Sequence, residues 1–124
     1  MDAVERLRSW SDCGGDVERR FSKDDLLTLV SLYWLTDSFA SSIRYYAEAP
    51  HSGWKPLRET QPAIPAPTGL SLFRYDLPPG PRDWVKGYFD LRLVREHASG
   101  GHFAPAENPD AVIADLRDTF RPLR

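Results

Sequence analysis

The chain has 124 residues, of which 41% are hydrophobic and 27% charged, and its formal net charge is −2 at pH 7. These values predict one globular domain with a modest core, and they exclude a strong electrostatic attraction to nucleic acid or to an anionic membrane. The one cysteine, Cys13, excludes an internal disulfide and a cysteine metal cluster, which favours a reducing, cytoplasmic compartment.

The N-terminal half is expected to be helical. Its first ten residues are charged and lack the apolar stretch of a signal peptide, and no window of the chain has the apolar length of a transmembrane helix. Residues 3–10 are expected to form one or two helical turns, followed by a polar loop over residues 11–20 that two glycines interrupt.

The strongest helix signal runs from residue 23 to residue 48. Ser22 and Asp25 have the spacing of a capping box, which predicts that the helix begins at Lys23. Between residues 26 and 35 the run is apolar nearly all round, which predicts burial on several sides. Asp37 and Ser38 are candidate positions for a break. Helical spacing is seen at Leu26, Leu29, Val30, Tyr33, Ala40, Ile43 and Ala47.

The C-terminal half is expected to alternate between strands and helices. Residues 50–67 are interrupted by prolines and form a connector, and the ranges predicted as strand, helix and strand are 68–73, 81–89 and 91–97. Asn108 as a cap and Pro109 in the first turn predict a last helix that Pro122 ends. Its predicted apolar face consists of Val112, Ile113, Leu116 and Phe120.

A strand–helix–strand–helix order favours a parallel sheet with covering helices, which is an α/β fold. Two parallel strands alone make a poor sheet, because such strands need burial on both faces and neighbours at both edges. The second half of the chain is therefore expected to be one end of a larger α/β domain.

Two titratable residues follow the two predicted strands. Asp76 lies just past the first strand and His102 just past the second, so both are expected at the carboxyl edge of the sheet, where functional groups gather. A carboxylate there can orient an imidazole and stabilise its protonated form, and Gly100 and Gly101 permit a tight turn. The alternative is that both are ordinary loop residues, since Asp is common in turns.

Four stretches of the chain resemble the C-terminal part of epoxide hydrolases of the α/β-hydrolase fold, the microsomal type and its bacterial relatives. They cover nearly the whole chain in the family's order. The resemblance is specific because three motifs coincide: GGHFA followed by a proline-capped helix, the LYW helix, and the PTG strand that ends in an acid. The stretches are WSDCGGDVERRFSKDDLLTLVSLYWLTDSFASSIRYYAE, PAPTGLSLFRYDLPP, DWVKGYF and GGHFAPAENPDAVIADLRDTFRPL.

The resemblance implies a two-step hydrolysis of an epoxide to a vicinal diol. In that family an aspartate attacks the epoxide carbon to form an ester, and a histidine–acid pair then activates water to hydrolyse it. His102 matches the base, and Asp76 matches its acid partner, which is Glu in many relatives. Tyr46 matches a tyrosine that binds the epoxide oxygen, with Tyr45 as the alternative if the register differs by one. Both tyrosines could instead serve packing alone.

The family's other parts are expected to be missing from this sequence. Residues 1–60 contain no nucleophile elbow, oxyanion-hole loop or second epoxide-binding tyrosine. Residues 1–60 then correspond to a helical lid- or cap-like segment with a connector, and residues 61–124 to the last part of the hydrolase core. The expected origins are half of a split protein, a truncated relic or a mis-assigned start.

The resemblance implies a small-molecule epoxide as the partner, with no metal and no organic cofactor. The net charge and the lack of a long apolar stretch predict that neither nucleic acid nor a membrane is a partner. Two rival functions stay open: an esterase-type hydrolase segment, and a non-catalytic fragment that self-associates or packs on a complementing chain. His51 and His97 are expected in solvated loops, and Arg19, Arg20 and Arg44 on solvated faces. Glu107 is expected in the first turn of the last helix. The tryptophans expected to pack in a core or lid are Trp10, Trp34, Trp54 and Trp84.

Overall fold

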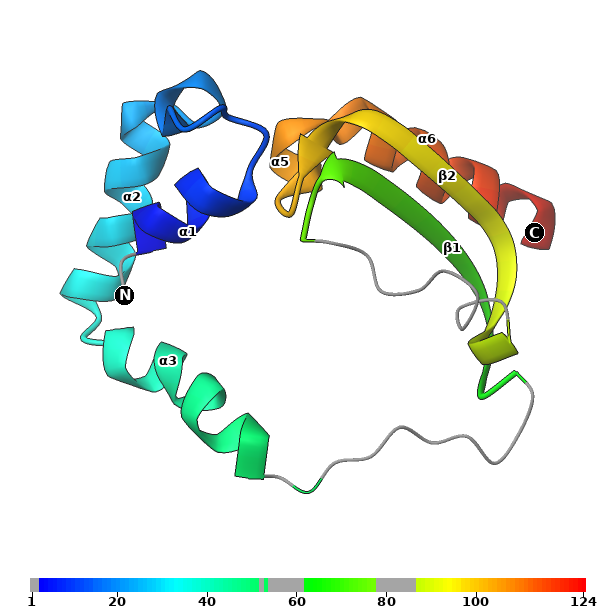
Figure 1. The fold of residues 1–124 in the computed structure, drawn as a ribbon, viewed down its shortest axis with the longest axis horizontal. Coiled ribbons are helices and arrows are strands. Elements are labelled where there is room, and N and C mark those ends of the chain that lie inside the picture. Colours follow the sequence, from blue (N-terminus) through cyan, green and yellow to red (C-terminus); the bar gives the residue numbers. More distant parts are fainter. Residues whose placement is uncertain (1–2, 52, 54–61, 78–86) are drawn as a thin grey trace.

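The computed structural model describes residues 3–51, 53, 62–77 and 87–124. Helices α1 to α3 lie to one side of a two-stranded sheet that carries α5 and α6 (Figure 1). The elements are α1 (Ala3–Trp10), α2 (Lys23–Leu35), α3 (Phe39–Glu48), β1 (Ile64–Tyr75), β2 (Phe89–Gly101), α5 (Ala104–Glu107) and α6 (Pro109–Phe120), with 3-10 turns at Val17–Arg19, Ala49–His51 and Arg121–Leu123.

The predicted helix starts are confirmed by their capping bonds. Ser22 Oγ accepts a hydrogen bond from the Asp25 backbone N–H at 3.1 Å, and Asp25 Oδ2 accepts one from the Ser22 N–H at 3.2 Å. These two bonds satisfy donors that the first turn of α2 leaves without partners. Asn108 caps α6 by accepting from the Ala111 N–H at 3.4 Å, and Pro109 is its first residue.

The predicted break near Asp37 is also confirmed. Asp37 has a left-handed φ of +51°, and the Ser38 and Asp37 N–H groups donate to the carbonyls of Tyr33 and Trp34 at 3.2 and 3.4 Å. This pattern is a Schellman motif, which ends α2 and redirects the chain.

No single helix among the described residues is long and apolar enough to cross a membrane. Lys23–Leu35 and Phe39–His51 reach that length and composition only together, and they are bent by 86°.

The two strands pair in parallel, as predicted, and each is longer than its predicted range. Thr68 pairs with Leu91 and Phe73 with His97, so the two strands end at the same edge of the sheet. Most of the helix predicted over residues 81–89 lies outside the described residues.

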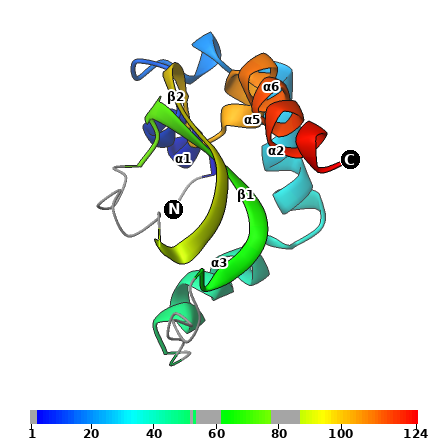
Figure 2. The same cartoon turned by 90° about the vertical axis from the view of Figure 1, so that its right-hand side faces the viewer.

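Helix α6 covers one face of this sheet (Figures 1 and 2). Gly69 lets the helix approach β1 closely, because a Cβ at this position would overlap the Thr119 side chain. The buried residues of α6 are Asp115 and Thr119. Side chains of the predicted apolar face are largely exposed instead: Ile113, Leu116 and Phe120 are exposed by 43%, 52% and 45%.

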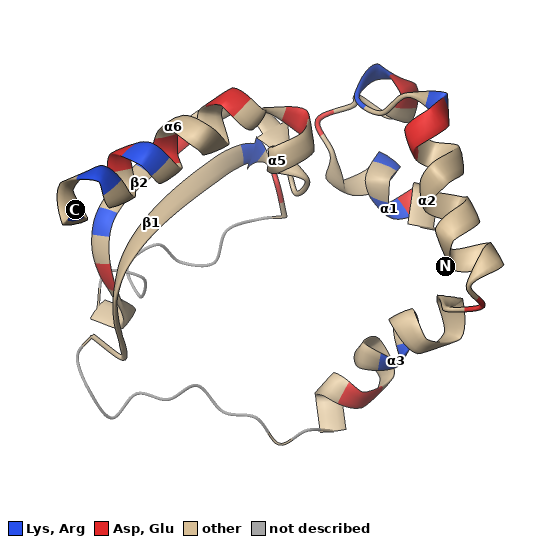
Figure 3. Ribbon diagram, turned by 180° about the vertical axis from the view of Figure 1, so that it is seen from behind, with Lys and Arg blue, Asp and Glu red and all other residues tan. Residues whose placement is uncertain are grey.

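The prediction that α2 is buried on several sides is wrong for the described residues. No α2 residue is buried, and Trp34 and Leu35 are exposed by 82% and 80%. Beyond its first turn α2 carries no charged residue (Figure 3), so its sequence has the composition of a buried helix. The physical reason for the difference is that the main packing partner of α2 is α1, which covers only one side of it.

Candidate functional site

The two predicted residues at the strand ends contact each other. Asp76 follows the last residue of β1 and His102 follows the last residue of β2. His102 Nδ1 lies 2.8 Å from Asp76 Oδ1, within the expected hydrogen-bond distance. Because an ionised carboxylate only accepts, Nδ1 donates this hydrogen bond, and in the neutral ring Nε2 is then the nitrogen that can accept a proton. An imidazole held in this way can act as a general base.

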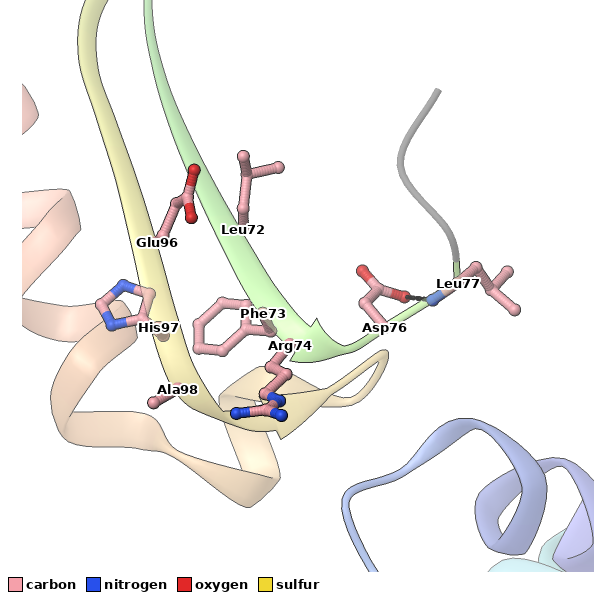
Figure 4. A pocket seen from close by; sticks show the side chains of 8 residues that line it. All are labelled: Leu72, Phe73, Arg74, Asp76, Leu77, Glu96, His97 and Ala98. Atoms are coloured by element: carbon pink, nitrogen blue, oxygen red, sulfur yellow. Dashed lines mark hydrogen bonds between the residues drawn. The ribbon is translucent and has the colours of Figure 1, made fainter. Parts of the chain in front are cut away.

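Asp76 is itself held in place by its own loop. Its N–H donates to the Phe73 carbonyl at 3.2 Å, and its Oδ1 accepts from the Leu77 N–H at 2.7 Å (Figure 4). One carboxylate oxygen therefore accepts from both the Leu77 backbone and the His102 ring. The hydrogen bonds of this turn therefore help to orient the carboxylate toward the histidine.

The glycine turn before His102 is packed closely against the segment that follows α1. Gly100 has a left-handed φ of +102°, and a Cβ on Gly101 would lie 2.6 Å from the Trp10 carbonyl oxygen. The His102 N–H donates to that same carbonyl at 2.8 Å. Both glycines are thus needed, the first for its conformation and the second for the close approach.

Three further residues hold this turn, and the sequence analysis missed their role. Asp12 Oδ2 accepts from the Gly100 N–H at 3.1 Å and from the Arg20 guanidinium at 2.7 Å. Glu107 accepts from the N–H groups of Asp12 at 2.6 Å and Phe103 at 3.0 Å. The prediction for Glu107 is therefore wrong, because Glu107 ends α5 and bridges two loops. Arg20 is exposed, as predicted, and in addition forms an ion pair with Asp12. Asp12 and Glu107 are 95 residues apart, so no local sequence pattern could have predicted their hydrogen bond.

Tyr46 and His102 line the same pocket, which has a volume of about 470 Å³. Tyr45 does not line it, and its side chain is 73% exposed. The Trp10 ring contacts the His102 ring edge-on, with centroids 5.1 Å apart. Apart from Arg6, Ser42, Tyr46 and His102, the lining is apolar or aromatic: Ala3, Leu7, Trp10, Leu29, Tyr33, Phe39, Ile43 and Phe103.

A second pocket, of about 570 Å³, lies beside Asp76 at the end of β1 (Figure 4). It contains the acid of the pair but neither His102 nor Tyr46. A substrate must reach both the base and the tyrosine, so the pocket that Tyr46 and His102 share is the candidate binding site. No group of three or more His, Cys, Asp or Glu side chains in the described part of the chain is placed to hold a metal ion.

A charged cluster lies between the sheet and α6. Asp115 accepts from Ser71 Oγ at 2.5 Å, from Arg95 at 2.6 Å and from His97 Nε2 at 2.7 Å. Burial raises the pKa of Asp115, but these three hydrogen bonds and the nearby His97 lower it by more, so the pKa lies below its ordinary value. The prediction that His97 lies in a solvated loop is wrong, because its ring is in β2 and 15% exposed.

The relatives and solved structures that resemble this chain are epoxide hydrolases. No family model matches the chain. Epoxide hydrolase 1 of Sus scrofa is 35% identical over 114 residues, which are 91% of this chain and 25% of that protein. The solved Aspergillus niger epoxide hydrolase is 34% identical with a TM-score of 0.72, over 98% of this chain and 29% of that one.

The juvenile hormone epoxide hydrolase from the silkworm Bombyx mori has a TM-score of 0.79 at 27% identity, over 97% of this chain and 31% of that one. The chain spans about a quarter of the length of the curated relatives it matches. In sequence and in structure, it is similar to the C-terminal portion of epoxide hydrolases of the α/β-hydrolase fold.

Proposed function

We propose that this chain supplies the base, its acid partner and an oxirane-binding tyrosine of an epoxide hydrolase. The observation that carries the proposal is the contact of 2.8 Å between His102 and Asp76 at the carboxyl edge of the sheet, beside a pocket that Tyr46 shares. Homology to epoxide hydrolases supports this reading over other hydrolytic reactions.

In the first step, a carboxylate from the rest of the enzyme attacks an epoxide carbon and the carbon–oxygen bond of the ring breaks. The ring oxygen becomes an alkoxide, accepts a hydrogen bond from the Tyr46 hydroxyl and takes its proton. The products are an alkyl ester and a tyrosinate. A hydrogen-bond donor aimed at this developing charge contributes most in the transition state.

In the second step, His102 Nε2 removes a proton from water, and the hydroxide adds to the ester carbonyl. Asp76 stabilises the imidazolium that forms. The ester carbon–oxygen bond then breaks, the alkyl oxygen takes the proton from His102, and the diol leaves. The carboxylic acid returns its proton to Tyr46. General-base assistance of this kind contributes roughly 10²- to 10⁴-fold.

The pocket also indicates the type of epoxide. Eight of its lining side chains are apolar or aromatic, so it suits an epoxide with an apolar substituent. The other four lining residues are Arg6, Ser42, Tyr46 and His102, and the proposed reaction uses the last two of them.

The 124-residue chain alone is expected to show no turnover of styrene oxide, because its sequence contains no nucleophile elbow and members of a catalytic unit act together.

A chimera tests the proposal directly: the chain replaces the matching C-terminal part of the Aspergillus niger epoxide hydrolase. We expect diol formation by the chimera. Turnover by the chain alone that His102→Ala abolishes would mean that a carboxylate within this chain is the nucleophile. A folded chimera that cleaves p-nitrophenyl esters but no epoxide would contradict the proposal.

Replacing Tyr46 with phenylalanine in the chimera is expected to slow ester formation roughly 10²-fold, as the loss of one donor to a developing oxyanion does. Hydrolysis of the ester should change little, because the alkoxide has already been protonated. Single-turnover kinetics with styrene oxide separate the two steps.

Tyr45→Phe is the matched control, because Tyr45 is the neighbouring tyrosine and does not line the pocket. It should leave both rates near those of the parent chimera. Equal slowing of both steps by Tyr46→Phe would indicate that Tyr46 has a structural role only.

A further inference from the structure

A second histidine–aspartate pair lies on the face of the sheet that α6 covers. His97 Nε2 is 2.7 Å from Asp115 Oδ2, and the two side chains are 15% and 4% exposed. The ionised carboxylate accepts this bond, so the ring donates from Nε2. The bond ties β2 to α6 and fixes the orientation of the His97 ring.

The His97 ring stacks on Phe73 in the neighbouring strand. The ring centroids are 4.7 Å apart and the planes differ by 18°, and Figure 4 shows the two rings side by side. A ring that is held by a hydrogen bond on one side and stacked on the other has little freedom to move.

Phe73 contacts both loops that carry the catalytic pair. Its carbonyl accepts from the Asp76 N–H at 3.2 Å, and its ring packs against Gly100, where a Cβ would lie 2.8 Å from Phe73 Cδ1. Phe73 is therefore a shared support of the Asp76 loop and of the Gly100–His102 turn. His97 stacks directly on this support.

We infer that His97 is a positioning residue: by holding the Phe73 ring, it sets the separation of the Asp76 and His102 loops. The inference rests on the proposed function, in which this pair acts on a bound ester. The Asp76–His102 bond is 2.8 Å long, and a displacement of either loop by about 1 Å would break it.

The test is nitrogen-15 NMR of the histidine rings in the 124-residue chain at pH 8. The chain has three histidines, and His51 lies exposed in a 3-10 turn, where it serves as the reference for an unconstrained ring. We expect His102 to show a single tautomer with a protonated Nδ1 and an unprotonated Nε2. His97→Ala should remove this pattern and give the tautomer mixture of His51.

Two more variants separate the parts of the His97 side chain. His97→Phe keeps an aromatic ring on Phe73 and should preserve the single tautomer of His102. His97→Gln keeps a hydrogen-bond donor for Asp115 but has no ring, so His102 should lose its single tautomer. The Gln variant also provides the test if alanine unfolds the chain.

Arg95→Gln is the matched control, because Arg95 also donates to Asp115 but is not stacked on Phe73. It should leave the His102 pattern intact. Three results would overturn the inference. The first is a folded His97→Gln chain in which the tautomer pattern of His102 is unchanged. The others are an Arg95→Gln chain that loses this pattern to the same extent, and a wild-type chain in which His102 shows no single tautomer. The NMR experiment uses no substrate, so its outcome does not depend on whether the chimera is active. An inactive chimera would contradict the proposed function, whereas only those three NMR results would overturn the role of His97.

Discussion

His102→Ala in the chimera is expected to stop the reaction after its first step, with one ester formed per active site and no further diol. The loss in steady-state turnover should be at least about 10⁴-fold, because the remaining members of a catalytic unit cannot replace the base. Asp76→Asn should cost roughly 10³- to 10⁴-fold, since the amide can donate to Nδ1 and favour the wrong tautomer. Mass spectrometry of the quenched enzyme detects the ester, and stopped-flow kinetics give both rates.

His51→Ala is the control for these two variants, because His51 is exposed and does not line the pocket shared by Tyr46 and His102. Its turnover should equal that of the parent chimera. If His102→Ala instead slowed ester formation as much as ester hydrolysis, then His102 would not be the base of the second step.

Asp115→Ala is expected to lower the free energy of unfolding by about 1–3 kcal/mol, as leaving buried hydrogen-bond donors without their acceptor does. Asp115 is 3% exposed and accepts from Ser71, Arg95 and His97, which would lose their shared acceptor. Urea denaturation of the 124-residue chain, followed by circular dichroism, measures the change.

The same carboxylate predicts how stability depends on pH. Burial raises the pKa of Asp115, but its hydrogen bonds lower it by more, so the folded pKa lies below the value of 3.8 for a free side chain. A lowered pKa stabilises the fold fully above the unfolded value, and this contribution is lost as the pH falls through the folded pKa. The difference in stability between wild type and Asp115→Asn should therefore be present at neutral pH and shrink below about pH 4.

Asp118→Asn is the control for both measurements. Asp118 also binds Arg95, at 2.9 Å, but its side chain is 48% exposed. Exposed ion pairs contribute little to stability, so this variant should differ only slightly from wild type. A stability difference for Asp115→Asn that increases toward low pH would contradict the assigned direction of the pKa shift.

Part of the candidate site could be predicted because it follows from rules that act over short distances. Residues that directly follow two parallel strands must meet at one edge of the sheet, which brought Asp76 and His102 together. The two glycines before His102 indicated a tight turn for the same local reason. Tyr46 was singled out by resemblance alone, and its place in the pocket depends on how α3 is oriented after the break at Asp37.

His97 shows why the rest could not be predicted. Its sequence position at the end of a strand allowed either a solvated or a packed side chain, and the choice depends on Phe73 and Asp115, which lie 24 and 18 residues away. The predicted strand over residues 91–97 did not indicate which face of the sheet the last helix would cover. A polar residue on the covered face becomes part of a network only when the helix supplies its partner.

The sequence by itself determined the capped starts of α2 and α6, the break near Asp37 and the parallel order of β1 and β2. Each of these depends on hydrogen bonds between residues a few positions apart or on the alternation of strands and helices. Only the tertiary structure decided that Glu107 binds the Asp12 backbone, that Asp115 gathers three donors and that α2 stays exposed. These features depend on which distant surfaces meet, and burial and pairing across such distances are set by the packing of whole elements rather than by local spacing.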